Sequence, residues 1–383
     1  MQHSLAVLGD LHYEVAQEAR FVRAQQQLRE HRPDAVVQLG DHGGYTHCGS
    51  WRSFMEGREF LSGIDAPFHT LIGNHDMEGA EYQSDAESIA AWCAAFGQQR
   101  PYCAFDLGPA LGICLSSQRY RSNVHFHHEV HLEDAQIEWF RSVLAENRHR
   151  PTFVFSHAPI WGSGLRVLLS VHLKLGNSYL NHADRPERFL RILDENPQIK
   201  LWFSAHNHLG HGYPDSVTRR GQCAFVHAGV VGDVTRDGHR QSRWIEYGEG
   251  GYVLGTVDHN TGERFENFAF DYGASKGEFL SPFTDADGPE HFAPPACPTS
   301  RERCSIGESV FAVCRGMVVE FDAASGHPVG VVAEGIGDAE LRRVRDELQI
   351  LSAGTVVRAV RAGRSGRFSP VFEPVRHEQP KSA

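Results

Sequence analysis

Short apolar runs alternate with polar clusters over the first half of the chain. Apolar runs that are bounded by turn residues are typical of buried strands. Five such runs lead into a polar cluster: Ser4 to Leu8, Ala35 to Leu39, Phe68 to Ile72, Thr152 to Phe155 and Ile199 to Phe203. Apolar residues recur at helical spacing from Glu14 to Glu30 and from Glu133 to Leu144, and Asp184-Arg185-Pro186 is typical of a helix start. The pattern predicts strands that alternate with helices.

Later residues favour a second sheet. Alternating runs cover Ala224 to His227, Tyr252 to Val257 and Arg264 to Phe270, and a turn lies at Asn260-Thr261-Gly262. We therefore expect an α/β fold built as a two-sheet α/β sandwich. Side chains at the carboxyl ends of neighbouring strands project into one crevice, so the polar clusters are expected to form a single site.

A change in composition predicts the domain organisation. Residues 273–305 are polar, rich in proline and without hydrophobic periodicity, which indicates a linker or a surface wrap between residues 1–272 and 306–383. The last region contains strand-like runs and a predicted helix from Asp338 to Leu348, so we expect a small α+β appendage. It carries no recognisable chemical motif.

Composition excludes several classes of protein. The content of 41% hydrophobic and 22% charged residues is typical of a globular protein rather than a disordered one. A net charge of -11 argues against broad attraction to nucleic acid or anionic membranes.

The segment Met1 to Leu8 is too short for a signal peptide and no apolar run could span a bilayer, so we expect a cytoplasmic protein. The 8 scattered cysteines are expected to be reduced.

The polar clusters share one kind of chemistry. All of their candidate ligands offer oxygen or imidazole nitrogen: Asp10, His12, Asp41, Asn74, His157, His206 and His208. Such donors suit Mn, Fe, Zn or similar ions, and a pair of ions can share one carboxylate while they clamp a phosphate. We expect Asp41 to be that shared ligand. Two divalent cations against two carboxylates leave a positive site, which suits the anionic phosphoryl group of a small phosphorylated substrate.

The order of these motifs resembles that of the calcineurin-like metallophosphoesterase superfamily. The resemblance rests on Asp10-Leu11-His12, Gly40-Asp41, Gly73-Asn74-His75-Asp76, His157 and His206-Asn207-His208, and it covers Leu5 to about Leu209. Each motif alone is weak, but five in the expected order, each after an apolar run, are specific. The segment Leu132 to Phe140 also resembles the helix that precedes the central histidine strand in this family. The resemblance implies a four-layer αββα fold.

The resemblance also implies a role for each residue. One metal ion would be held by Asp10, His12, Asp41 and His208, and the other by Asp41, Asn74, His157 and His206. A water that bridges the ions would attack phosphorus in line. His75 would stabilise or protonate the departing oxygen, and we expect Asp76 to orient His75 through a carboxylate–imidazole hydrogen bond. The family usually has glycine before the last His-x-His pair, whereas this chain has Ala205.

Other interpretations stay open at this stage. Asp10, Asp41 and Asn74 are residue types that often only form turns at strand ends. His42, His47, His211 and His227 are expected to be lining or structural residues, and the cluster of His125, His127, His128 and His131 is expected to be a solvated loop. A non-catalytic scaffold with a partner-binding carboxy-terminal region and a metal-dependent nuclease are the rival functions. Scaffolds usually lose ligands, and a nuclease predicts a basic groove.

The substrate branch rests on the residues after Asp41. Serine/threonine protein phosphatases carry an arginine there and a glutamate in place of Asp76, whereas this chain has His42-Gly43-Gly44. The chain therefore resembles the branch of cyclic-nucleotide and other small phosphodiesterases, which implies a small phosphorylated substrate with a nucleotide among the candidates. Phosphomonoesterase and nucleotide pyrophosphatase activities remain alternatives, and the segment Trp161 to Asp184, which includes Tyr179, is expected to form a cap that selects among them.

Overall fold

The chain divides into two compact units. The structure is a computed structural model that describes residues 3–272, 303–314, 316–323, 328–336, 339–345, 347–362 and 368–372. The first unit comprises Met1–Leu168 and Leu175–His291, and the second comprises Leu169–Lys174 and Phe292–Ala383. Most of the predicted linker, residues 273–302, lies outside the described residues.

The first unit contains two six-stranded sheets. The first sheet has the order β12-β11-β10-β1-β2-β3, and its strands are β1 (His3–Leu8), β2 (Ala35–Gln38), β3 (Phe68–Thr70), β10 (Gln241–Tyr247), β11 (Gly251–Asp258) and β12 (Arg264–Asp271). Its strands β1, β2 and β3 are parallel, with Leu5 opposite Ala35 and Val36 opposite Phe68. β10 joins β1 in the antiparallel sense. The carboxyl ends of β1, β2 and β3 therefore lie at one edge.

The second sheet has the order β4-β5-β6-β7-β9-β8. Its strands are β4 (Cys103–Leu107), β5 (Ala110–Leu115), β6 (Thr152–Ser156), β7 (Ile199–Ser204), β8 (Val217–Arg220) and β9 (Cys223–His227). The four central strands β5, β6, β7 and β9 are parallel, and β4 and β8 close the two sides as antiparallel neighbours. The five strands predicted before polar clusters are thus distributed over both sheets.

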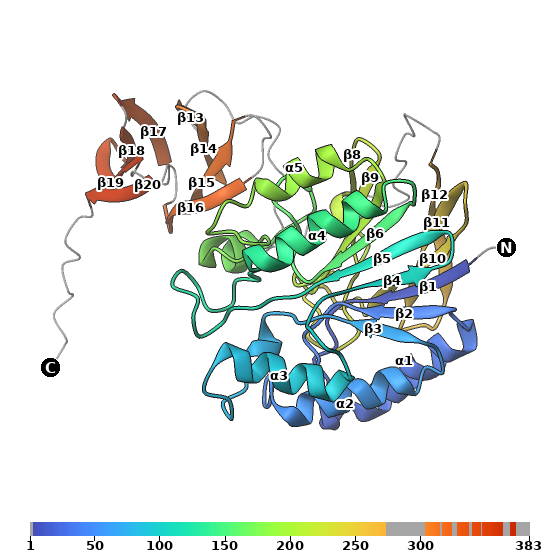
Figure 1. Ribbon diagram of the computed structural model, residues 1–383. Helices are drawn as coiled ribbons and strands as arrows, with labels where there is room; N and C mark the ends of the chain where they lie inside the picture. Colours follow the sequence, from blue (N-terminus) through green and yellow to red (C-terminus); the bar gives the residue numbers. More distant parts are fainter. Residues whose placement is uncertain are drawn as a thin grey trace, which may run out of the picture. The chain divides into compact units, whose positions relative to one another are not determined.

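Alternation along the strands explains why the sheets pack face to face. In β1, Leu5 and Val7 join the core between the two sheets, whereas Ala6 and Leu8 face the helices on the other side. In β7, Leu201 and Phe203 face the same inner core, and Trp202 faces the second helical layer. Helices cover the outer faces of both sheets (Figure 1), so the predicted two-sheet α/β sandwich with four layers is confirmed.

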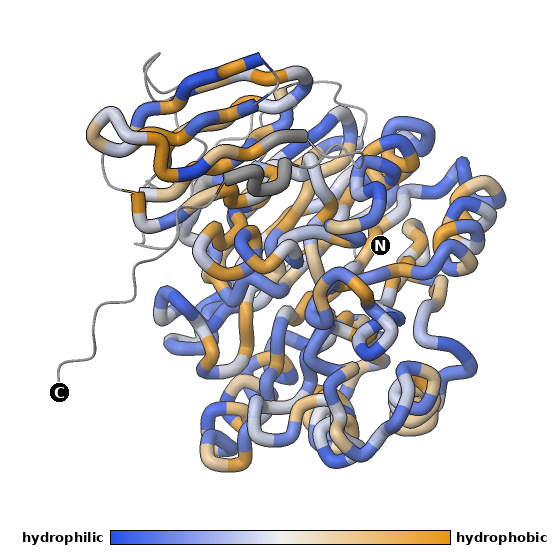
Figure 2. Tube along the Cα trace, turned by 90° about the vertical axis from the view of Figure 1, so that its left-hand side faces the viewer, coloured by the Kyte–Doolittle hydropathy of each residue, from blue (hydrophilic) through white to orange (hydrophobic). Residues whose placement is uncertain are grey.

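The helices are short and amphipathic. They are α1 (Glu18–His31), α2 (Trp51–Ser62), α3 (Asp85–Phe96), α4 (Asp134–Glu146) and α5 (Arg188–Glu195), with single turns η1 (Val15–Gln17), η2 (His75–Met77), η3 (Leu169–Leu173) and η4 (Pro214–Ser216). Hydrophobic and hydrophilic residues alternate along the helices in Figure 2. In α4, Ile137, Phe140 and Leu144 are buried, as the stripe in the sequence predicts. No helix of the described residues is long and apolar enough to cross a membrane.

The carboxy-terminal part of the second unit consists of strands among its described residues. They form two four-stranded sheets: β13 (Arg303–Ile306), β14 (Ser309–Cys314), β15 (Met317–Asp322) and β16 (Pro328–Glu334), then β17 (Ala339–Val344), β18 (Glu347–Ser352), β19 (Thr355–Ala362) and β20 (Phe368–Phe372). A hydrophobic core joins residues of both sheets, among them Phe311, Val318, Leu348 and Ile350.

The helix predicted from Asp338 to Leu348 is wrong. The described residues there belong to the antiparallel strands β17 and β18, with Leu341 opposite Ile350. Leu341, Leu348 and Ile350 are buried and Arg342 is exposed, which is a period of two rather than of 3.6. Arg345 has a left-handed backbone (φ 61°) and lies in the turn between the strands, so the chain reverses where a helix would have continued.

Candidate metal centre

The candidate metal centre is the set of seven predicted ligands, and each follows a strand end. Asp10 and His12 follow β1, Asp41 follows β2 and Asn74 follows β3 in the first sheet. His157 directly follows β6, and His206 and His208 follow β7 in the second sheet. All seven are at most 3% exposed. The site therefore lies where the carboxyl ends of strands from both sheets meet.

Strained backbone accompanies these side chains. His12, Asp41, His206 and His208 have positive φ angles of 42°, 56°, 70° and 52°. Residues other than glycine rarely adopt this conformation, and where they do the surrounding structure must hold them there. Close backbone approach also matters, because a Cβ on Gly73 would lie 2.2 Å from Asp41 Oδ1. Gly73 thus leaves room for the Asp41 carboxylate.

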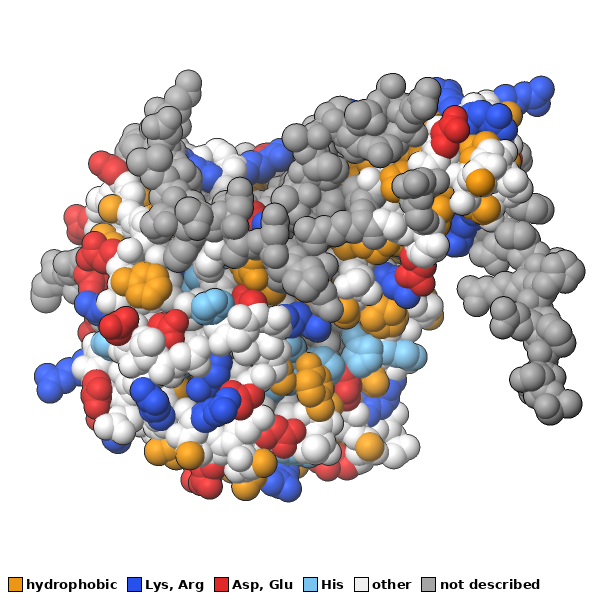
Figure 3. All heavy atoms as spheres, turned by 180° about the vertical axis from the view of Figure 1, so that it is seen from behind, with side chains coloured by type: hydrophobic (Ala, Val, Ile, Leu, Met, Phe, Trp, Pro, Cys, Tyr) orange, Lys and Arg blue, Asp and Glu red, His pale blue; other side chains and the backbone are white. Residues whose placement is uncertain are grey.

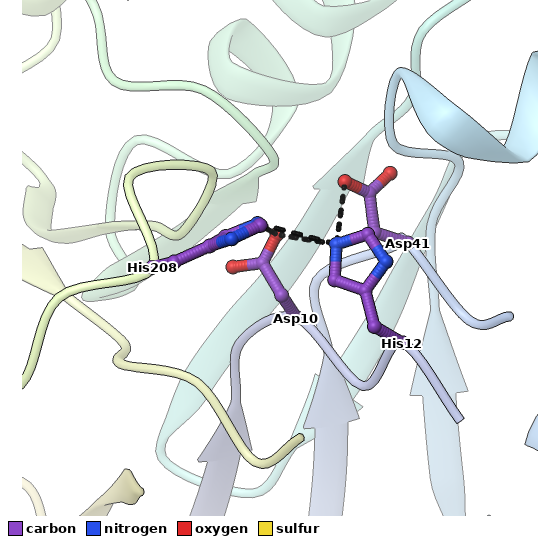
Figure 4. A group of neighbouring side chains, drawn as sticks. All are labelled: Asp10, His12, Asp41 and His208. Atoms are coloured by element: carbon purple, nitrogen blue, oxygen red, sulfur yellow. Dashed lines mark hydrogen bonds and ion pairs between the residues drawn. The ribbon is translucent and has the colours of Figure 1, made fainter. Parts of the chain in front are cut away.

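One group of ligands gathers around the two aspartates. Asp10 Oδ1 lies 3.2 Å from His208 Nε2, 3.7 Å from His157 Nε2 and 3.9 Å from His12 Nε2. Asp41 Oδ2 lies 3.1 Å from His157 Nε2 and 3.6 Å from His12 Nε2. Asp10, His12, Asp41 and His208 point toward one another in Figure 4, and their ligand atoms lie within 4.8 Å of one another.

A second group lies beside the first. Asn74 Oδ1 is 2.9 Å from His206 Nδ1, and the backbone N–H of His206 donates to Asp10 Oδ2 at 3.0 Å. The rings of His157 and His206 are 5.1 Å apart between centroids. His157 therefore contacts Asp41 on one side and lies beside the His206 ring on the other.

Backbone carbonyls fix the tautomers of two histidines. His12 Nδ1 lies 3.2 Å from Gly43 O, and His157 Nδ1 lies 2.6 Å from Leu39 O. A carbonyl oxygen only accepts, so each of these nitrogens donates, and Nε2 of each ring faces the two aspartates. His206 lies between two acceptors, since its Nε2 is 3.0 Å from Asn177 O and its Nδ1 is 2.9 Å from Asn74 Oδ1.

The hydrogen bonding and the charges of the seven residues show whether cations would fit among them. Asp10 Oδ1, Asp41 Oδ2 and His157 Nε2 are buried without a hydrogen-bond partner. Burial favours the neutral acids, yet the facing histidines, His208 for Asp10 and His157 for Asp41, outweigh it and hold both carboxyl pKa values below their ordinary range. Ionised carboxylates that face only imidazoles in a buried site fit bound cations.

The charges of the two aspartates and the neighbouring histidines also shift the pKa values of His12 and His157. Burial and His208 lower the pKa of His12 to about 3, so its imidazole is neutral. Burial also acts to lower the pKa of His157, but the carboxylates of Asp41 and Asp10 outweigh it and raise that pKa to about 9. His157 therefore carries a proton in the metal-free protein at neutral pH, and a bound cation would displace that proton.

The prediction that the Asp76 carboxylate accepts a hydrogen bond from the His75 ring is wrong. Asp76 Oδ2 accepts the backbone N–H groups of Asp41 and Gly73 at 2.8 and 2.9 Å, and Asp76 Oδ1 accepts the backbone N–H and Nδ1 of His42 at 2.9 Å each. His75 Nδ1 lies 2.6 Å from Glu78 Oε1 instead. Asp76 follows His75 directly in sequence, but the η2 turn directs the two side chains to different partners.

His75 lies beside the candidate metal centre. Its ring centroid is 5.3 Å from that of His12 and 5.2 Å from that of Tyr45, and its backbone N–H donates to Asp41 Oδ1 at 2.9 Å. Burial acts to lower the pKa of His75, but the carboxylates of Asp41 and Glu78 outweigh it and raise that pKa above its ordinary value.

Sequence reasoning missed Glu78 and misplaced other residues. Glu78 follows His75 by three residues, the spacing that brings side chains to one face of a helical turn, so a signal was present. His131 is 3% exposed, and His128, whose side chain is 33% exposed, pairs with Glu78 at 2.8 Å, whereas His125 and His127 are exposed as the prediction of a solvated loop requires. Tyr179 of the predicted cap is 1% exposed and packs in the interior, whereas Asn177 of the same segment contacts His206.

Comparisons with known proteins agree with this geometry. The family model "Calcineurin-like phosphoesterase" matches residues 3–210. The glycerophosphodiester phosphodiesterase GpdQ of Enterobacter lignolyticus is 27% identical over 186 residues, which are 47% of this chain and 58% of that relative, so the match leaves much of the relative uncovered.

Two solved structures are also similar. A dimetal phosphatase from Danio rerio has a TM-score of 0.52 at 15% identity and covers 69% of this chain and 98% of its own, which shows the shared fold. A purple acid phosphatase from yellow lupin (Lupinus luteus) seeds has a TM-score of 0.48 at 12% identity, and the match covers 70% of this chain and 53% of that one.

Proposed function

This chain belongs to the calcineurin-like phosphoesterase family, and we propose that it hydrolyses small phosphodiesters with two bound metal ions. One observation carries the proposal. Seven oxygen and imidazole donors from both sheets converge, and the buried atoms Asp10 Oδ1, Asp41 Oδ2 and His157 Nε2 are left without hydrogen-bond partners. A buried site of this kind is costly to a protein unless cations bind there.

The two groups of ligands support an assignment of each residue. Asp10, His12, Asp41 and His208 would hold one ion, and Asp41, Asn74, His157 and His206 the other. Asp41 is the shared ligand in this proposal because its Oδ2 faces His12 at 3.6 Å and His157 at 3.1 Å, and these histidines belong to different ions. Imidazole and oxygen donors without thiolate suit Mn, Fe or Zn.

The bound ions, the backbone carbonyls and His75 would have different roles in the reaction. Two bound ions would supply Lewis acidity and would lower the pKa of a bound water. The carbonyls of Gly43 and Leu39 hold the imidazoles of His12 and His157 in the tautomers that ligation needs. His75, whose pKa is raised, would give its proton to the alcohol oxygen that leaves phosphorus.

The charge of the site and the sequence similarity to GpdQ support a small phosphodiester as the substrate. The relative GpdQ is a glycerophosphodiester phosphodiesterase by name. Acidic and basic side chains are interspersed over the described residues on the face that Figure 3 shows, without the continuous basic surface that nucleic acids require. Two carboxylates against two divalent cations leave a net positive site, which suits the single negative charge of a phosphodiester.

The test is hydrolysis by metal-stripped protein to which Mn(II) is returned. Bis-p-nitrophenyl phosphate serves as the diester and p-nitrophenyl phosphate as the monoester. We expect metal-dependent turnover with a higher kcat/KM for the diester, and we expect Asp41→Asn to abolish it because the shared carboxylate is lost. The exposed Asp65, which has a left-handed backbone (φ 63°) that asparagine tolerates, offers Asp65→Asn as the matched control.

Three outcomes would contradict this proposal. No turnover of either ester with Mn, Fe, Zn or Ni, despite two bound ions, would reject the enzyme. A preference for the monoester would reject the diester as the substrate class and favour a phosphomonoesterase. Full activity in Asp41→Asn would reject the assignment of the shared ligand.

A further inference from the structure

Glu78 is the common partner of three side chains at the edge of the candidate metal centre. Its Oε1 lies 2.6 Å from His75 Nδ1 and 2.8 Å from His128 Nδ1, and its Oε2 accepts from Cys48 Sγ at 3.1 Å. Cys48 lies before α2, His75 begins η2, and His128 lies before α4. Three separate segments of the chain thus meet at one carboxylate.

The local backbone explains why Glu78 reaches His75. The N–H of Glu78 donates to His75 O at 3.2 Å, which closes the turn η2 and brings side chains three residues apart to the same face. The backbone of His75 is fixed separately, since its N–H donates to Asp41 Oδ1. Asp41 therefore fixes the main chain of His75, and Glu78 fixes its ring.

The charge of Glu78 decides which nitrogen of His75 is left for chemistry. Burial favours the neutral acid, but His128 and His75 outweigh it and lower the pKa of Glu78 to about 2. An ionised carboxylate offers no proton, so the proton of this 2.6 Å ion pair lies on Nδ1 of His75. Nε2 is then the nitrogen that remains for a substrate oxygen.

We propose that Glu78 is a positioning residue that holds the His75 ring so that Nε2 donates to the departing oxygen. This inference rests on the proposed function. In the reaction, a water oxygen forms a new bond to phosphorus, and the bond between phosphorus and the alcohol oxygen breaks. That alcohol oxygen takes the proton from His75 Nε2. One water proton stays on the phosphate, and the other passes to solvent, from which His75 regains a proton.

The geometry favours Glu78 over the other carboxylates. Both oxygens of Asp76 are occupied by backbone N–H groups and by His42. Asp41 Oδ1 accepts the His75 backbone rather than its ring. Glu78 is thus the carboxylate in contact with the His75 ring among the described residues. Orientation of an imidazole acid by a carboxylate at Nδ1 is a known requirement of efficient proton transfer.

The test compares two diesters that differ only in the leaving alcohol. Methyl phenyl phosphate releases phenol, which needs a proton, whereas methyl p-nitrophenyl phosphate releases the more acidic p-nitrophenol, which needs it less. We expect Glu78→Gln to lower kcat for methyl phenyl phosphate on the order of 100-fold and kcat for methyl p-nitrophenyl phosphate less than about 3-fold. Bound metal, measured in the same samples, should stay at the wild-type content.

Glu56 provides the matched control. Its Oε2 lies 2.6 Å from His47 Nε2, and its side chain is 17% exposed against 18% for Glu78, so it forms a similar carboxylate–imidazole pair away from His75. Glu56→Gln should leave both kcat values unchanged. If Glu78→Gln does not fold, Glu78→Asp keeps the charge, shortens the side chain and should show the same dependence on the leaving alcohol.

A double-mutant comparison makes the proposal refutable. In a His75→Ala background, Glu78→Gln should cause no further loss, because the ring that it positions is absent. An equal loss for both esters, or a loss that adds to that of His75→Ala, would overturn the positioning role. Turnover by the wild type with an unchanged ratio in Glu78→Gln would reject this inference alone, whereas no turnover by the wild type would reject the proposed function.

Discussion

Two groups of buried polar residues adjoin each other at the carboxyl ends of β2 and β3, and they differ in how well their atoms are paired. The first is the candidate metal centre. The second, which we call the Asp76 network, consists of Gln38, His42, Thr70 and Asp76. All four of its residues are at most 1% exposed. They touch the candidate metal centre through the Asp41 backbone N–H, which donates to Asp76.

In the Asp76 network each carboxylate and amide oxygen has a partner. Asp76 bonds His42, His42 Nε2 bonds the Thr70 hydroxyl at 2.8 Å, and Thr70 donates to Gln38 Oε1 at 2.7 Å. In the candidate metal centre, one oxygen of Asp10 and one of Asp41 have no hydrogen-bond partner. Burial and polarity are the same in both groups, so they differ in hydrogen bonding: the Asp76 network satisfies its oxygens within the protein, whereas the candidate metal centre leaves two carboxylate oxygens that face only imidazoles.

The largest expected effect is on the Asp76 network. We expect Asp76→Asn to lower the free energy of unfolding by about 3 kcal/mol, because the amide nitrogen would face backbone donors that now share a carboxylate. Urea unfolding of metal-stripped protein, monitored by circular dichroism, measures this change.

Asp41→Asn is the comparison that distinguishes a metal ligand from a residue that only stabilises the fold. Two tightly bound ions raise the free energy of unfolding, by about 2.7 kcal/mol for each ion at a hundredfold excess over its Kd. Asp76→Asn should keep most of this metal-induced rise, whereas Asp41→Asn should lose most of it. A full rise in Asp41→Asn, or its loss in Asp76→Asn alone, would show that the two groups had been assigned the wrong way round.

The position of the seven residues after strand ends could be predicted from the sequence, because strand ends are visible as apolar runs before polar clusters. It predicted the sheets less completely. β10 (Gln241–Tyr247) lies in the middle of the first sheet, yet it contains Ser242 and Arg243, which are fully buried. Arg243 is accommodated by donating to the His227 carbonyl and to Asn267, far away in sequence. Such compensation depends on tertiary contacts and leaves no local pattern.

The same reason explains the error at Asp76. The residue type and its place beside His75 were correct for an orienting carboxylate. Which imidazole it meets depends on the direction of the η2 turn and on His42, which comes from the loop after β2. Local sequence therefore predicted the presence of a carboxylate–imidazole pair, but only the fold determines the partners.

A smaller effect is expected from pH. The pKa of His157 rises from 6.5 to about 9 in the metal-free folded chain. The folded state thus holds this proton more tightly than the unfolded state, and the resulting stability is present below pH 6.5 and is lost as the pH rises through 9. The lowered carboxyl pKa values of Asp10 and Asp41 contribute above their ordinary 3.8, so they do not change in this window.

We therefore expect metal-free protein to lose about 2.8 kcal/mol of unfolding free energy between pH 6.5 and pH 9.5, since each unit of pKa shift is worth about 1.4 kcal/mol. Urea titrations at several pH values measure it. The loss should be much smaller in His157→Gln, where the raised pKa of His75 still contributes. Metal-loaded protein should show the opposite trend because ions compete with protons for the same nitrogen. A flat profile for metal-free wild type would remove His157 from the ligand set.

The smallest effect is expected at Ala205, where the family usually has glycine. Ala205 is not among the residues with positive φ, its N–H donates to His157 O at 2.7 Å, and its methyl group packs in the core between the sheets. The methyl group thus adds no backbone strain. We expect Ala205→Gly to lower the free energy of unfolding by about 1 kcal/mol, through backbone entropy and lost packing, with kcat and metal content unchanged. A severalfold rise in kcat or in metal affinity would instead show that the methyl group distorts the strained turn before His206, and that pairing of atoms is not sufficient to define this centre.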